Sequence, residues 1–386
     1  MAIKCMTTAK SQGESKLKQE MKRKHRVEFG SSDESMVPEN FIWPDEFKAR
    51  ESVPELDVPH IDLQKFVSEN ENDIEEATRL VDEACRKHGF FVLVNHGVDM
   101  ELMKNVHECM DEFFSLPLDV KQKAQRKVGE NYGYANSFIG RFSSKLPWKE
   151  TFSLRYAAHH NLPVTHDYVC HHLGPEFSQQ GKVYEECGKA LSDLSLKIVE
   201  LLGLSLGVPK EKFKKFFEDN DSIIRLNYYP PCNKPELTLG TGPHCDPTSI
   251  TILHQDHVSG LQVYVDDQWH SIPPIKDSFV INIGDTFMAL TNGVYKSCFH
   301  RAVVNCREAR KSIVFFLCPA DDKVVRAPDE IVDKNPPRKF PDYTWPMLLE
   351  LTQKFYRSDS NTFKAFTTWL QHKNLATAAS SLAPSL

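Results

Sequence analysis

Two histidines and an aspartate stand where they could hold one metal ion. In the stretch GTGPHCDPTSITIL, His244 and Asp246 lie two residues apart, just before an apolar, β-branched run. Alternate residues of a strand project from the same face, so both side chains could contact one ion. His300, in the strand-like run YKSCFHRAVV, could supply a third ligand. Two imidazoles and one carboxylate leave coordination positions open, as in non-haem Fe(II) oxygenases, whereas a structural zinc site would be closed by a fourth ligand.

A basic side chain and a hydroxyl follow in the run ARKSIVFF. Arg310 and Ser312 lie at even spacings after His300, so strand parity predicts that they face the same way. A guanidinium beside a hydroxyl inside an apolar barrel is a receptor for a carboxylate. An unpaired Arg310 would be costly there, and we therefore expect an anion to meet it.

Three rival groups of polar residues have simpler interpretations. His60 and Asp62 precede the first helix, where a turn histidine and a helix-capping aspartate are expected. His254 and Asp256 close the strand that follows His244, and HQDH is expected to be a solvated turn. The stretch AAHHNLPVTHDYVCHHLG has no regular ligand spacing and is expected to be an exposed loop. The sequence contains no nucleotide-binding, serine-hydrolase or zinc-peptidase motif.

Hydrophobic periodicity predicts helices in the first half and at the end of the chain. Apolar residues recur at helical spacing over residues 73–89, 100–115, 178–206 and 345–369, and residues 90–95 form a short apolar strand. After Ser222 the chain reads as short strands separated by Pro, Gly, Asn and Asp. Asn292-Gly293 predicts a type I′ hairpin among them. The pattern is that of a helical first half supporting an antiparallel barrel.

The overall composition indicates which kinds of binding partner and which cellular compartment to expect. The net charge of −6 gives no reason to expect nucleic acid or an anionic membrane as partner, and no apolar run is long enough for a membrane span. The 10 cysteines include no CxxC pair, and no signal peptide precedes them. Reduced thiols and a cytoplasmic location are expected.

Several blocks resemble the plant branch of the Fe(II)- and 2-oxoglutarate-dependent dioxygenases. The resemblance covers about residues 58–370 and includes RKHGFFVLVNHGV, NYYPPC, the His-x-Asp…His set and Arg310-x-Ser312. Within that family, LPWKETFSLRY together with NYYPPC is similar to the gibberellin 20-oxidases.

The resemblance implies a fold and a set of site residues. The fold would be mainly β with helical additions, a double-stranded β-helix (jelly roll) core flanked by N-terminal and C-terminal helices. His244, Asp246 and His300 would hold the iron. Arg310 and Ser312 would bind the distal carboxylate of 2-oxoglutarate, supported by Tyr229 and Asn227. We divide the chain into a disordered tail (1–38), an N-terminal helical region (39–215), the jelly-roll core (216–330), C-terminal helices (331–372) and a loose tail (373–386).

The resemblance also implies an activity. Fe(II), 2-oxoglutarate as cosubstrate, molecular oxygen and ascorbate as reductant would support successive oxidation of carbon-20 of a gibberellin, through alcohol and aldehyde to loss of that carbon or a carboxylic acid. The partner would be a small diterpenoid, and the protein would act as a monomer. LPWKET is the segment that the family associates with substrate, although Trp148 could equally be a packing residue. Two alternatives stay open: a plant dioxygenase acting on a flavonoid or a different gibberellin position, and a hormone-binding barrel without catalysis.

Overall fold

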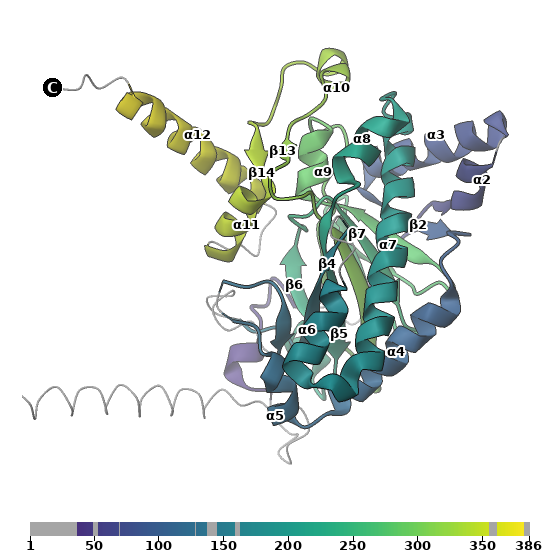
Figure 1. The fold of residues 1–386 in the computed structure, drawn as a ribbon, viewed down its shortest axis with the longest axis vertical. Helices are drawn as coiled ribbons and strands as arrows, with labels where there is room; N and C mark the ends of the chain where they lie inside the picture. The colour runs from purple at the N-terminus through teal and green to yellow at the C-terminus, as the bar shows by residue number, and fades with distance from the viewer. Residues whose placement is uncertain are drawn as a thin grey trace, which may run out of the picture. The chain divides into compact units, whose positions relative to one another are not determined.

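Two β-sheets form the centre of the protein (Figure 1). The computed structural model describes residues 37–48, 53–68, 70–127, 129–136, 145–158, 163–354 and 361–381. In this part of the chain the larger sheet has eight strands, in the spatial order β1 (His60–Asp62), β2 (Phe90–Val94), β10 (Phe279–Ile283), β7 (Ile250–Gln255), β12 (Arg310–Leu317), β5 (Asp221–Tyr229), β4 (Glu150–Ala157) and β3 (Gly133–Ala135). The smaller sheet has four, β6 (Thr241–His244), β11 (His300–Ala302), β8 (Leu261–Val265) and β9 (Gln268–Ile272). The expected jelly-roll core with flanking helices is confirmed.

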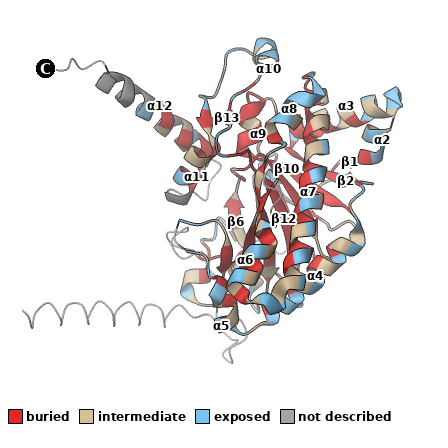
Figure 2. Ribbon diagram, viewed as in Figure 1, coloured by how far each residue is buried: buried red, intermediate tan, exposed pale blue. Residues whose placement is uncertain are grey.

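Helices cover the larger sheet, and the long ones were predicted closely. They are α2 (Leu63–Val67), α3 (Glu71–Lys87), α4 (Met100–Ser115), α5 (Leu118–Lys121), α6 (Val164–Leu173), α7 (Ser178–Ser205) and α8 (Lys210–Phe217). Helix α7 contacts β4, β7 and β12 and also packs against α3, α4 and α6. Its apolar stripe is buried because it lies between the sheet and these helices (Figure 2). No described helix is long and apolar enough to cross a membrane.

The larger sheet crosses the boundary that the sequence suggested at residue 216. Strands β1 to β4 come from the region expected to be helical, yet they share one sheet with β5, β7, β10 and β12. The sequence analysis assigned no strand to β4, although its residues 151–156 alternate between polar and apolar types as a strand does, and seven of its eight residues are buried. The N-terminal region is therefore part of the same sheet rather than a separate support.

Two stretches expected to be loops or hairpins are helical or end a helix. The histidine-rich stretch contains α6, although its residues 159–162 lie outside the described part. Asn292 and Gly293 adopt the positive φ angles of 53° and 75° that a type I′ turn needs, but they follow α9 (Asp285–Leu290) and join no two strands. The same residue pair suits both structures, because Asn and Gly tolerate the left-handed conformation that often ends a helix.

His254 is buried, so the prediction of a solvated turn at HQDH is wrong for this residue. Its Nδ1 lies 3.0 Å from Nε2 of His107 on α4. Burial lowers the pKa of His254 to about 4, which keeps the ring neutral at physiological pH. Of the other rival pair, Asp62 caps α2 as expected by accepting a hydrogen bond from the Gln64 amide, while His60 lies in β1 and not in a turn.

The C-terminal part contains more helix than expected. After β13 (Val324–Val325), α10 (Asp329–Lys334) and β14 (Tyr343–Thr344), the chain forms α11 (Trp345–Lys354) and α12 (Thr362–Ser381). Helix α12 extends into residues 373–386, which were expected to be loose, because this stretch is rich in alanine, the strongest helix former. The expected N-terminal tail, 1–38, lies outside the described residues except for its last two.

A buried ion pair ties the start of β4 to the helices. Glu150 accepts hydrogen bonds from Nζ of Lys121 at 2.7 Å and from the hydroxyl of Tyr134 at 2.5 Å. Lys121 also donates to the Phe114 carbonyl at 2.9 Å. The side chains of Lys121 and Glu150 are 8% and 9% exposed, so neither charge has water as a replacement partner. Glu150 of LPWKET therefore has a structural role.

We predict that Glu150→Leu lowers the free energy of unfolding by about 3 to 5 kcal/mol, because it leaves the Lys121 ammonium buried without a counter-charge. The double variant Lys121→Met/Glu150→Leu should be clearly more stable than Glu150→Leu, since it removes both charges. Urea denaturation followed by circular dichroism measures both effects. Equal destabilisation by the single and double variants would contradict the assignment.

Candidate active site

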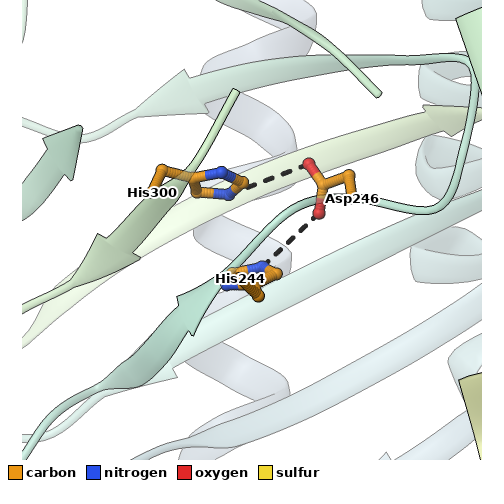
Figure 3. A group of neighbouring side chains, drawn as sticks. All are labelled: His244, Asp246 and His300. Atoms are coloured by element: carbon orange, nitrogen blue, oxygen red, sulfur yellow. Dashed lines mark ion pairs between the residues drawn. The ribbon is translucent and has the colours of Figure 1, made fainter. Parts of the chain in front are cut away.

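The three predicted metal ligands lie together (Figure 3). His244 ends β6 and His300 begins β11, and the two residues pair directly across these antiparallel strands. Asp246 follows β6, with Oδ1 3.4 Å from Nε2 of His244 and Oδ2 3.7 Å from Nε2 of His300. One possible ligand atom from each residue lies within 4.8 Å of the other two. Among the described residues this is the one such group of three.

The reason for this convergence differs from the strand parity expected. Strand β6 ends at His244, so Asp246 lies in the following turn and not on the same strand face. The turn is held by hydrogen bonds: Oδ2 of Asp246 accepts from the Thr251 hydroxyl at 2.7 Å, and its carbonyl accepts from the Asp285 amide at 2.8 Å. Cross-strand pairing places the two histidines, and the turn brings the carboxylate to them.

Backbone carbonyls fix the orientation of both imidazoles. Nδ1 of His244 lies 2.9 Å from the Gly242 carbonyl, and Nδ1 of His300 lies 3.1 Å from the Cys298 carbonyl. A carbonyl can only accept, so each Nδ1 carries a proton, and each Nε2 lies on the side of Asp246 as the nitrogen available to a metal ion. This is the usual arrangement of histidines that bind metal ions.

The electrostatics of the site favour the forms that bind a metal ion. Burial, followed by the neighbouring His244, lowers the pKa of His300 to about 4. Burial alone would raise the pKa of Asp246, but the two imidazoles and the Thr251 hydroxyl bring it well below the usual range. At neutral pH His300 is therefore neutral and Asp246 ionised. Two imidazoles and one carboxylate fit a divalent ion such as Fe(II).

Arg310 and Ser312 line the same cavity as the histidines but come from the other sheet. They belong to β12 of the larger sheet, and not to the sheet of His300, so parity with His300 does not explain their position. In the register of β12 with β5, Arg310 pairs with Tyr229 and Ser312 pairs with Asn227. Asn227 donates to the Ser312 hydroxyl at 3.2 Å.

The Arg310 guanidinium is arranged to receive an anion. It is 2% exposed, lies 5.2 Å from the centre of the Tyr229 ring and donates to Oε1 of Gln255 at 2.7 Å. In the part of the chain that the structure describes, its Nε has no hydrogen-bond partner and no carboxylate lies within ion-pair distance, although its charge acts on the pKa of Asp256. Gly260 makes room for the side chain, because a Cβ there would lie 2.7 Å from Cδ of Arg310. A buried cation in this state calls for a carboxylate ligand.

These residues line one cavity of about 140 Å³ between the two sheets. The C-terminal segment contributes Trp345 and Leu349 of α11 and Thr362 of α12. Two cations that line the cavity, Arg225 and Arg301, were not predicted from the sequence. Arg225 could have been found, because it shares the face of β5 with Asn227 and Tyr229 at spacings of two residues.

Of the segment LPWKET, Lys149 lines the cavity, whereas Trp148 and Glu150 do not. Nζ of Lys149 donates to the Thr241 hydroxyl at 2.9 Å and to Oδ1 of Asn227 at 3.4 Å, beside the Tyr229 ring. Trp148 is not among the residues that line the cavity; its Nε1 donates to the Pro230 carbonyl and its ring packs edge-on against Phe41. The packing interpretation of Trp148 therefore fits the structure.

We predict that Thr251→Val weakens binding of a divalent metal roughly 10- to 100-fold, because Asp246 loses the hydrogen bond that orients its carboxylate. The measurement is calorimetric titration of the metal-free protein with Mn(II). Ser249→Ala is the matched control, because the buried Ser249 hydroxyl has no hydrogen-bond partner in the described residues. Equal loss in both variants, or none in Thr251→Val, would argue against this role.

Comparisons with known proteins agree with this geometry. Residues 220–319 match the model of the 2OG-Fe(II) oxygenase superfamily, and residues 58–175 match that of the non-haem dioxygenase in morphine synthesis N-terminal region. A crystal structure of JOX2 in complex with 2OG, Fe and JA has a TM-score of 0.75 and 31% sequence identity, covering 87% of this chain and 95% of that one.

The sequence relatives are more similar still. Gibberellin 20 oxidase 2 of Arabidopsis thaliana is 55% identical over 97% of this chain and 99% of its own length. Gibberellin 20 oxidase 1 of the same plant is 59% identical, with 86% of this chain and 89% of the relative covered. Gibberellin 20 oxidase 1-A of Triticum aestivum is 54% identical, with coverage of 88% and 93%. The chain belongs to the gibberellin 20 oxidase family, within the 2OG-Fe(II) oxygenase superfamily.

Proposed function

We propose that this chain oxidises carbon-20 of twenty-carbon gibberellins, with Fe(II) and 2-oxoglutarate, through the alcohol and the aldehyde to loss of that carbon or a carboxylic acid. The observation that carries the proposal is the pairing, in one cavity, of a His-Asp-His group with a buried Arg310 that lacks a carboxylate partner. A protein that only bound a hormone would need neither open metal positions nor a receptor for a second acid.

His244, Asp246 and His300 are the proposed iron ligands, through Nε2 of each imidazole and a carboxylate oxygen. Bound iron supplies the activation of dioxygen, coupled to oxidative decarboxylation of 2-oxoglutarate to succinate and carbon dioxide. Two imidazoles and one carboxylate leave the remaining coordination positions for cosubstrate and oxygen. Ascorbate as reductant, a monomeric state and a cytoplasmic location stay predictions.

Arg310 and Ser312 are the proposed receptor for the distal carboxylate of 2-oxoglutarate. The guanidinium offers a bidentate hydrogen-bond geometry, and its burial keeps water from competing for the carboxylate. Tyr229 supports Arg310 through the ring face, and Asn227 orients the Ser312 hydroxyl by donating to it. Both supports come from β5, so the receptor rests on two paired strands.

The rest of the cavity suits a compact apolar acid. Its lining includes apolar side chains from both sheets and α11, namely Ile223, Leu253, Leu261, Val314, Phe316 and Leu349. A gibberellin is a rigid, mostly apolar diterpenoid with carboxyl groups, so it needs apolar walls and a few polar anchors. The walls hold the target carbon near the metal ligands, and repeated oxidation requires that the alcohol and aldehyde be held in the same position.

The direct test is product analysis by mass spectrometry after the iron-loaded protein acts on a twenty-carbon gibberellin with 2-oxoglutarate. We expect the carbon-20 alcohol and aldehyde and their successors. His244→Ala should yield none of them and release little succinate, because it removes a proposed iron ligand. Hydroxylation at a ring position would refute the site of oxidation, and equal succinate release from both proteins would remove the three ligands from the reaction.

A second test concerns the cosubstrate. Arg310→Ala should raise the half-saturation for 2-oxoglutarate at least about tenfold, since charge-assisted hydrogen bonds to the carboxylate are lost. Lys311→Ala is the matched control, because the neighbouring Lys311 pairs with Asp111 and is not among the residues that line the cavity. Cosubstrate titrations monitored by succinate release compare the two. An unchanged value in Arg310→Ala would show that another residue receives the carboxylate.

A further inference from the structure

The inner face of β5 carries a guanidinium, that of Arg225, in addition to the Arg310 guanidinium that the paired strand β12 contributes to the cavity. Four alternate residues of this strand line the cavity, Ile223, Arg225, Asn227 and Tyr229. Arg225 lies four residues before Tyr229, roughly 13 Å along the strand from the position that pairs with Arg310. On β12 its neighbour is Val314, so it stands on the more apolar part of the wall.

Neighbouring strands hold the Arg225 side chain in place. Its Nε donates to the Ser153 hydroxyl at 3.0 Å, and Ser153 is its register partner on β4. The guanidinium carbon lies 5.1 Å from the centre of the Phe316 ring, which also lines the cavity. Stacking on a ring and a fixed Nε orient the planar group along the wall. A guanidinium held in this way is suited to bidentate binding of a carboxylate.

Four cations line the cavity in the described part of the chain, and they differ in what surrounds them. They are Lys149, Arg225, Arg301 and Arg310, and the carboxyl groups that line the same cavity are those of Asp246 and Asp285. Asp246 belongs to the proposed metal group. Arg301 donates hydrogen bonds to Oε1 of Gln262 and to the Phe47 carbonyl, and its guanidinium lies over the Trp269 ring.

Lys149 and Arg310 both lie beside Tyr229, in the part of the cavity assigned to 2-oxoglutarate. Lys149 is tied there by the Thr241 hydroxyl and Oδ1 of Asn227. Arg225 is the cation on the apolar part of the wall, next to Val314 and Phe316.

We propose that Arg225 binds a carboxylate of the gibberellin substrate, while Arg310 binds that of 2-oxoglutarate. This inference rests on the proposed function, since the substrate class comes from it. Two guanidinium groups on one strand pair give each acid its own receptor. The separation orients the diterpenoid, because one polar anchor fixes which edge of an apolar molecule faces the metal ligands.

The test compares binding of a twenty-carbon gibberellin with binding of its methyl esters. Calorimetric titrations are made without oxygen, on the full-length protein loaded with Fe(II) and 2-oxoglutarate. The wild type should bind the acid roughly 10- to 100-fold more tightly than the ester that blocks the anchored carboxylate. Arg225→Gln should lose this preference and keep its affinity for 2-oxoglutarate, whereas Arg225→Lys should keep part of the preference because the charge remains.

Arg126→Gln is the matched control. Arg126 donates to the same Ser153 hydroxyl, at 2.8 Å, but is not among the residues that line the cavity. We expect this variant to keep the preference for the acid. A preference retained in Arg225→Gln, or lost equally in Arg126→Gln, would overturn the inference.

The same titrations separate the inference from the proposed function. If the wild type prefers the acid through Arg225 but leaves carbon-20 unoxidised on turnover, the anchor stands and the proposed reaction fails. If it oxidises carbon-20 yet binds acid and esters equally, the anchor fails alone. Loss of 2-oxoglutarate binding in both Arg225 variants would also overturn the inference, because Arg225 would then belong to the cosubstrate receptor.

Discussion

The carboxylate of Asp246 is a negative charge inside the protein, 4% exposed, and the site is arranged around keeping it ionised. Burial opposes this charge, so neighbouring groups must stabilise it. The Thr251 hydroxyl donates to one oxygen, and the imidazoles of His244 and His300 lie near both. A divalent cation would neutralise the charge far more fully than these contacts do. The burial of this carboxylate therefore favours binding of a divalent cation, because Asp246 has little access to water.

Each of the two sheets positions a different group of site residues. The smaller sheet and the turn after it carry the His-Asp-His group, while paired β5 and β12 of the larger sheet carry Arg310, Ser312, Asn227 and Tyr229. Residues on paired strands are held by the backbone ladder, so their separation is set more firmly than it would be on loops. The cavity between the sheets receives groups from both, and the C-terminal segment adds Trp345 and Leu349 to its wall. Geometry at the metal thus depends on how the sheets pack, and not on any single element.

Much of this was visible in the sequence where local patterns govern the structure. Helix α4 begins and ends at the residues that its apolar spacing indicated, because one face is buried and the other is solvated. Strand β4 was not predicted, although its residues 151–156 alternate between polar and apolar types as a strand does. The burial of His254 depends on His107, far away in the chain, and no local pattern encodes such a contact. The three proposed ligands do lie together, but strand parity does not explain why. Asp246 lies beyond the end of β6, and His300 and Arg310 belong to different sheets.

The segment LPWKET shows why a family motif need not be a set of substrate contacts. Trp148 packs against Phe41, and Glu150 is buried in an ion pair with Lys121. Lys149 reaches the cavity, but beside Tyr229 and Asn227. Trp148 and Lys149 precede β4, which begins at Glu150, and the three side chains have different partners. Trp148 and Glu150 of the motif therefore stabilise the structure at the edge of the site, and Lys149 adds a positive charge to the cavity wall. Groups that contact the diterpenoid are better sought on the inner faces of β5 and β12, where residues two apart share the cavity wall.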